Sequence, residues 1–424
     1  MTLPLNFNLS VKIKNLFQLI FILFTLFSVS YNFTPVVIPT TYLSIVVMFI
    51  TFLYQIYTVG KVTIINRSSL IFCSLFILSS ILSYLLNFSK TDAYMIRIST
   101  MYFLIILFTP AIYILMFKRN DLLILKTIGY AGFINAIFII TMLVIPSFQS
   151  FYLSFINSST LSLIGSDAIE NAMSLRMIGI TGFSVYSAGF MQILCALFFT
   201  IYIYYKNGNN FKPSIFEIFI LAFILLSSII AARSSFIGVT ILIFIIFKLA
   251  NIFQFLKITL FNIAILLGSL TVLIVFLPSH LQDFFIHWLT EFFQSGKETG
   301  SLQANINMFQ YNWNDFSSIG DSRWFGDNND YYMNVDVGWY RILFSVGYLG
   351  LLFWIFTIVC TLGLNNIFSL KFTNEQWITI SILIYIFIMN FKGALLFDSF
   401  QSVFLLATLN LIFKSRRNKK YIVN

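Results

Sequence analysis

Runs of about twenty consecutive apolar residues recur along this chain, and they constrain its fold more than any other feature. About twenty helical residues are needed to cross the roughly 30 Å hydrocarbon core of a bilayer. The runs are continuous rather than alternating with polar residues, which argues against a membrane β-barrel. Only 9% of the residues are charged, whereas a soluble domain carries about 25%. We therefore predict an all-α polytopic membrane protein.

The apolar runs predict about twelve transmembrane helices. The stretch 214–250 is too long for one helix, so two spans should meet near Ala232 and Arg233. The predicted spans are 16–33, 36–57, 69–87, 94–117, 122–146, 184–205, 214–231, 234–250, 258–277, 338–364, 376–391 and 394–413.

The distribution of charge predicts which ends of these spans face the cytoplasm. If the N-terminus is inside, every inside loop is basic, and only Asp121, Glu217 and Glu375 of the 15 acidic residues lie inside. This is the bias that the positive-inside rule expects, so both termini should be cytoplasmic. The net charge of +10 is then an orientation signal and requires no nucleic-acid partner.

The predicted topology divides the chain into three parts. Residues 1–277 form a transmembrane bundle of spans one to nine, with an outer loop at 147–181. Residues 278–337 form a large, partly helical outer loop before the tenth span. Within it, the apolar side chains of LQDFFIHWLTEFFQ recur at helical spacing and predict an amphipathic helix at the membrane surface. Residues 338–424 form spans ten to twelve and a basic cytoplasmic tail.

Two arginines on the predicted outer side are not explained by topology. An Arg at the bilayer centre costs about 2.5–3.5 kcal/mol on the insertion scale, so Arg233 in AARSSFIG needs a reason. Its side chain could extend to the lipid headgroups, or its planar guanidinium could bind phosphate oxygens. Arg176, in SLRMIGITGFSVYSAG, has the same two interpretations.

A second charged group surrounds the point where the outer loop re-enters the membrane. Asp336 lies at this point and is the candidate acid or base, although Arg341 could be merely its structural partner. Arg323 could be a solvated loop residue or a substrate contact. His287 could pack at the membrane surface or transfer a proton.

Neither a metal nor a cofactor is predicted. The three cysteines lie far apart, and the DNND stretch lacks the glycine and glutamate of a calcium loop. Arginines together with a carboxylate on the outer face instead suit a lipid-diphosphate substrate, because guanidinium groups bind phosphate and a carboxylate can accept a proton.

Three segments, in order, carry a family resemblance that covers roughly residues 170–365. RMIGITGFSVYSAG resembles an Arg-plus-glycine segment before a span, AARSSFIG resembles a Ser/Arg segment between two central spans, and VDVGWYRILFSVGYLG resembles the stretch after a large loop. The arrangement is similar to the Wzy-type polysaccharide polymerases and the related O-antigen ligases of the C-type glycosyltransferase superfamily. Ligases typically place a His before the re-entering span, and its absence here favours a polymerase.

The resemblance implies a multi-pass protein of the bacterial inner membrane whose large loop is periplasmic. It would transfer a growing glycan from undecaprenyl diphosphate to the next lipid-linked repeat unit, without metal or cofactor, and could have a chain-length-regulating membrane protein as a partner. An O-antigen ligase, a lipid-linked oligosaccharide flippase and a scaffolding subunit are the alternatives. The resemblance assigns roles by residue: the leaving diphosphate to Arg233 and Arg176, an assisting or orienting role to Arg341, the base to Asp336, and substrate contacts to Arg323, His287, Trp339 and Tyr340.

Overall fold

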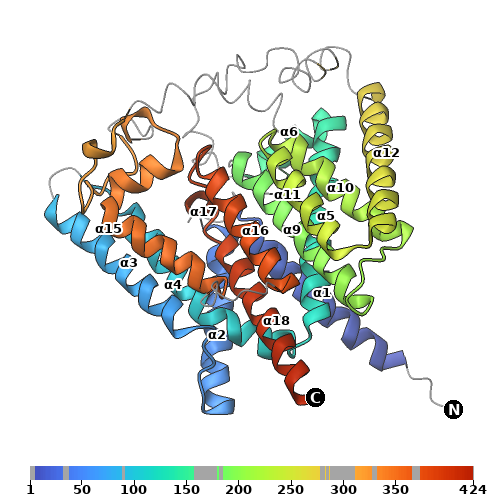
Figure 1. The fold of residues 1–424 in the computed structure, drawn as a ribbon, viewed down its shortest axis with the longest axis horizontal. Helices are drawn as coiled ribbons and strands as arrows, with labels where there is room; N and C mark the ends of the chain where they lie inside the picture. The colour runs from blue at the N-terminus through green and yellow to red at the C-terminus, as the bar shows by residue number, and fades with distance from the viewer. Residues whose placement is uncertain are drawn as a thin grey trace. The chain divides into compact units, whose positions relative to one another are not determined.

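The computed structural model is helical through most of the residues it describes (Figure 1). Among those residues, six helices are long and apolar enough to cross a membrane, and four shorter apolar helices accompany them. The predicted class, a helical membrane protein, is confirmed, while the span count of about twelve stays a prediction. The described residues are 5–31, 38–87, 91–156, 179–180, 185–276, 282, 286, 311–326, 332–364 and 373–423.

Every predicted span overlaps a helix, although the ends differ. The helix break predicted near Ala232 and Arg233 is present, because α10 ends at Ala231 and α11 begins at Ser235. The last long helix starts at Ser402, later than predicted. The helices and helical turns are α1 (Leu5–Leu26), α2 (Thr40–Val59), α3 (Arg67–Leu86), α4 (Tyr94–Ala111), the π-helical η1 (Ile112–Met116), α5 (Asp121–Val144), α6 (Pro146–Ser154), α9 (Val185–Lys206), α10 (Ile215–Ala231), α11 (Ser235–Leu249), α12 (Ile252–Phe276), η3 (Trp313–Asp315), η4 (Tyr332–Asn334), α15 (Gly338–Thr361), α16 (Asn374–Met389), α17 (Leu395–Asp398) and α18 (Ser402–Val423).

The helices group into two compact units, which are described separately. Both units draw on distant parts of the chain, so the predicted three-part division by residue range concerns membrane topology and stays a prediction. Unit 1 comprises Met1–Lys61, Ala111–Ser235 and Leu242–Leu273, and unit 2 comprises Val62–Pro110, Phe236–Ile241 and Ile274–Asn424.

In unit 1, the buried helix α9 packs against both α5 and α10. Two glycines of α5 permit this closeness, because a Cβ on Gly129 would overlap Phe199 and one on Gly132 would overlap Cys195. Small residues at helix contacts are typical of membrane bundles. At one end, an ion pair of 2.8 Å between Lys206 Nζ and Glu217 Oε1 joins α9 to the start of α10.

In unit 2, α15 packs against α3 and α18. The rings of Phe72 and Phe356 stack with centroids 4.9 Å apart. Gly350 brings the two helices close, since a Cβ at this position would lie 3.2 Å from Ser79 Oγ. Dispersion contacts of this kind, rather than a hydrophobic driving force, hold helices together inside a bilayer.

The helix α15 is broken at Gly347, where φ is 65° and ψ is −167°. The segment 317–322, which we call the strap, runs along the break and exchanges backbone hydrogen bonds with it. Asp321 and Ser322 donate to the carbonyls of Phe344 and Ser345 (2.6 and 3.0 Å), and the strap's carbonyls at 317 and 318 accept from the amides at 348 and 349 (3.3 and 3.1 Å). Irregular backbone is tolerated at membrane depth only where protein or a polar cavity satisfies it, and the strap does so here.

Hydrogen bonds join distant segments at each end of unit 2, and the predicted topology assigns these two ends to opposite sides of the membrane. At one end, Asn87 donates from Nδ2 to the Gly320 carbonyl (2.9 Å), and Tyr94 donates from its hydroxyl to the Phe397 carbonyl (3.3 Å). At the other end, Lys414 donates from Nζ to the Ile65 carbonyl (3.3 Å). In the first set, Gly320 lies in the predicted outer loop, and Asn87, Tyr94 and Phe397 lie at or near the outer ends of predicted spans. In the second set, both residues lie in predicted inside segments, so the grouping agrees with the predicted alternation.

Replacing Gly347 with Ala should destabilise the protein strongly. A Cβ would lie 2.5 Å from the Ile319 amide nitrogen, and the positive φ adds strain. We expect a loss of roughly 2–4 kcal/mol in the free energy of unfolding, seen as a lower thermal midpoint of the purified protein in detergent. The matched control is Gly60→Ala, because Gly60 has the same φ of +65° but nothing within 4 Å. Equal losses in the two variants would contradict the proposed role of the strap contact.

Candidate functional site

Within unit 2, Asp92 joins the described residues 311–326 of the predicted outer loop to the start of α4. One carboxylate oxygen of Asp92 accepts hydrogen bonds from the amides of Trp324 (2.6 Å) and Phe325 (3.0 Å). Its other oxygen accepts from the Tyr94 amide (3.1 Å) at the start of α4. The Tyr94 ring stacks on the Trp324 indole with centroids 4.9 Å apart and planes at 18°. These contacts fix the loop on the helix ends and bury Trp324 to 1% exposure.

Trp324 forms one wall around Arg341, in the first turn of α15. The Arg341 side chain is only 2% exposed, and its guanidinium carbon lies 3.8 Å from the centroid of the Trp324 ring. The Asp398 carboxylate lies 4.0 Å from Arg341 Nη1. A desolvated cation over an indole gains about 2 kcal/mol or more. A buried guanidinium is nevertheless costly, so the ring and the carboxylate compensate for its lost hydration.

A second carboxylate acts on the same cluster. Asp336 is half-buried, two residues before α15 begins. Asp398 lies in the connection between α16 and α18, outside the membrane-spanning helices. Burial raises the pKa of the Asp398 carboxyl to about 6, the Arg341 charge opposes this shift, and the Asp336 charge adds to it. A carboxyl with such a pKa can change its charge near neutral pH.

The other predicted site residues of this region contact aromatic rings of the protein. Arg323 is half-buried, with its guanidinium carbon 5.2 Å from the centroid of the Tyr332 ring. Trp339 packs edge to face against Trp354, Phe387 and Phe391. Tyr340 stacks on Phe316 with centroids 5.3 Å apart. Both aromatic residues therefore pack within the protein, and their contact with sugars stays a prediction.

In unit 1, two of the three family-like segments meet. Gly189, at the end of RMIGITGFSVYSAG, lies against the break between α10 and α11, where a Cβ on it would overlap Ser235 Oγ and lie 2.9 Å from Ala232 Cβ. Arg233 stands in that break and is half-buried. Gly189 is thus required for the close approach of α9 to the Arg233 turn.

Buried polar groups accompany this turn. The Asn135 carbonyl oxygen accepts from the Ile180 amide (2.7 Å), and Gln192 donates to Ser227 Oγ (2.7 Å). Among the described residues, the buried hydroxyls of Ser234 and Ser235 have no hydrogen-bond partner. Buried polar atoms are rarely left without a hydrogen bond, so these two hydroxyls could bind water or a polar ligand.

Arg176 and His287 lie outside the described residues, as do Asp327 and Asp330 of the DNND stretch. Arg233 belongs to unit 1 and Arg341 to unit 2. The predicted convergence of the three arginines on one headgroup therefore stays a prediction. Within the described part of the chain, no three His, Cys, Asp or Glu residues gather in a way that could hold a metal ion.

Sequence reasoning missed three members of the Arg341 cluster. Asp398 was not assigned to the site, and the structure brings it to Arg341. Trp324 was not assigned a role. Asp92 carried a usable signal, because Asp two residues before a helix-forming run is typical of a helix N-terminus.

The raised pKa of Asp398 predicts a pH-dependent contribution to stability. Below the ordinary carboxyl pKa of 3.8 the contribution is fully present, and it is lost as the pH rises through about 6. Asp398→Asn keeps this position neutral. From about pH 4 to 7, the unfolding free energy of the wild type should therefore fall relative to the variant by on the order of 2 kcal/mol. Thermal unfolding in detergent measures this, with the exposed Asp315→Asn as control. A wild-type-to-variant difference that is constant across this range would contradict the assignment.

Comparison of the chain with protein-family models, with curated proteins and with solved structures finds no match in any of the three. The function of the site is therefore argued from its own geometry and chemistry.

Proposed function

We propose that this chain is a polysaccharide polymerase of the bacterial inner membrane, which transfers a growing glycan from undecaprenyl diphosphate to the next lipid-linked repeat unit at the outer face. The observation that carries the proposal is the buried Arg341, held between the Trp324 ring and Asp398 with Asp336 close enough to affect Asp398. A buried guanidinium is costly, and charged groups with a perturbed pKa that are buried together often mark functional sites. If the cluster served stability alone, apolar residues of similar volume could replace the buried charged pair without loss.

The proposed reaction is a single displacement at the anomeric carbon of the donor sugar. The acceptor hydroxyl attacks this carbon and forms the new glycosidic bond. The bond between the carbon and the diphosphate oxygen breaks, and the lipid diphosphate leaves with the electron pair. A protein carboxylate takes the hydroxyl proton. The leaving group needs stabilisation of its negative charge, which preorganised guanidinium groups can supply.

The roles of individual residues follow from their exposure. Asp336 is half-buried at the loop and is the proposed base. Arg233 is half-buried at a helix break, and it is proposed to hold the leaving diphosphate together with Arg176. Arg341 is too deeply covered to hold the whole leaving group. We assign it a positioning role, in which it orients the two carboxylates and keeps the loop on the helix ends.

Replacing Arg233 with Ala should shorten the surface glycan to single repeat units. Loss of one charge-stabilising donor in a desolvated site costs roughly 10²–10³-fold in rate. Gel analysis of the glycan from a complemented deletion strain measures chain length, and membrane levels of the variant confirm its folding. The control is Arg97→Ala, an exposed Arg on the same predicted side. Unchanged chain length in Arg233→Ala would refute the assignment, and loss of all surface glycan would indicate a flippase instead.

Replacing Asp336 with Asn should lower the turnover rate by roughly 10²–10⁴-fold while substrate binding is kept. The reason is that Asn retains the shape of the side chain and cannot accept the proton. Polymerisation by the reconstituted protein with purified lipid-linked repeat units measures this, with Asp315→Asn as the exposed control. Full activity in Asp336→Asn combined with loss of activity in Asp398→Asn would transfer the role of base to Asp398.

A further inference from the structure

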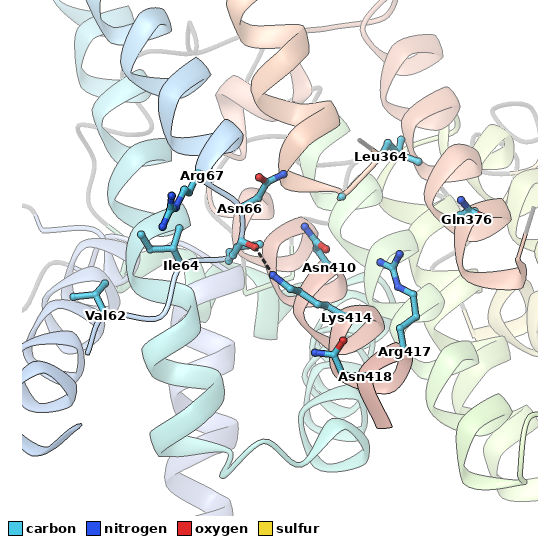
Figure 2. A pocket seen from close by; sticks show the side chains of 12 residues that line it. Val62, Ile64, Asn66, Arg67, Leu364, Gln376, Asn410, Lys414, Arg417 and Asn418 are labelled. Atoms are coloured by element: carbon cyan, nitrogen blue, oxygen red, sulfur yellow. Dashed lines mark hydrogen bonds between the residues drawn. The ribbon is translucent and has the colours of Figure 1, made fainter. Parts of the chain in front are cut away.

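A pocket of about 770 Å³ lies in unit 2, at the end of the helices away from the Arg341 cluster (Figure 2). It is lined by residues from four segments: the stretch that leads into α3, the residues just after α15, the first turn of α16 and the middle and later turns of α18. Its volume falls within the range of about 300–1,000 Å³ that small-ligand sites occupy. The predicted topology places this end of unit 2 at the cytoplasmic membrane surface.

The pocket concentrates positive charge without a counter-charge. Arg67, Lys414 and Arg417 line it together with several side-chain amides, and none of the lining residues is Asp or Glu. In the described part of the chain, no carboxylate lies within ion-pair distance of these three cations. The first turn of α3, which contains Arg67, adds the partial positive charge of a helix N-terminus. The pocket therefore favours an anion.

Helix capping does not explain why these cations are here. Basic residues often bind the last carbonyls of a helix. At the end of α15, however, the Cys360 carbonyl accepts from Asn66 Nδ2 (3.3 Å) and the Thr361 carbonyl accepts from Asn410 Nδ2 (2.9 Å). Gly363 completes the helix end with a left-handed φ of +77°. The amides and the glycine satisfy α15, so the cations remain available for a ligand.

Two of the cations are also held in place. Lys414 donates from Nζ to the Ile65 carbonyl (3.3 Å), an interaction drawn as the dashed line in Figure 2. Arg417 donates only from Nε, to the Phe413 carbonyl (3.4 Å), among the described residues. Its two Nη groups can therefore form a bidentate contact. The orientation rule explains basic residues on this side, but it does not require them to converge on one pocket.

We propose that this pocket binds a phosphate-bearing group, with Arg67, Lys414 and Arg417 contacting its oxygens. Guanidinium groups match phosphate geometry, and an ammonium adds a compact charge. The phosphate belongs either to an anionic lipid headgroup of the same leaflet or to a soluble phosphate compound. The pocket is distinct from the Arg341 cluster, which lies at the other end of unit 2.

The experiment uses the full-length protein and two probes. In nanodiscs that contain phosphatidylglycerol and phosphatidylcholine, native mass spectrometry measures the anionic lipid retained. In nanodiscs of phosphatidylcholine alone, titration calorimetry measures binding of inorganic pyrophosphate. The variant is Lys414→Gln with Arg417→Gln, and the matched control is Lys118→Gln with Arg119→Gln. The control removes the same two charges from an exposed turn in unit 1.

The proposal expects the wild type and the control to bind one of the probes, and the pocket variant to lose at least about tenfold in affinity or retention. Retention of lipid alone identifies a headgroup site, and saturable binding of pyrophosphate identifies a soluble ligand. Binding of neither probe would overturn the proposal, as would equal losses in the control. Normal glycan length in the pocket variant would leave this inference intact, because the transfer site is separate.

Discussion

The structure of unit 2 depends on the need to satisfy backbone hydrogen bonds inside a bilayer. The break in α15 at Gly347 would leave amides and carbonyls without partners in hydrocarbon, where each costs several kcal/mol. The strap supplies those partners, and its path requires the backbones at Gly320 and Gly347 to touch. Trp324 is the second residue after the strap, so the hydrogen bonds that satisfy the broken helix also help to place the indole over Arg341.

The charged cluster follows from this placement. The Arg341 guanidinium can be buried because an aromatic face and a carboxylate replace its water. Asp398 stays partly accessible, at 25% side-chain exposure, and burial raises its pKa to about 6. The cluster thus combines a fixed cation with a carboxyl whose charge can change. That combination is more useful for moving a proton than for stability, because a buried ion pair contributes little net free energy to folding.

The sequence predicts the features of this fold that depend on local composition. Span positions follow from apolar length, and the break at Ala232–Arg233 follows from the excess length of the stretch 214–250. The break at Gly347 was not predicted, because the apolar run around it is continuous and only the distant strap makes it possible. The partners of Arg341 were missed for the same reason, since Asp398 and Trp324 reach it through long-range contacts that no local pattern encodes.

The cations at the two ends of unit 2 have different surroundings, and this difference is the reason that we propose different roles for the two ends. At the Arg341 end, each described cation of the cluster lies over an aromatic ring, as Arg323 does over Tyr332. Such pairing holds the guanidinium groups in place against the rings. At the Arg67 end, the side-chain amides of Asn66 and Asn410 bind the last carbonyls of α15, and three cations line a pocket that has no carboxylate among its lining residues. The first end fits the proposed glycosyl transfer, and the second end fits the proposed phosphate site.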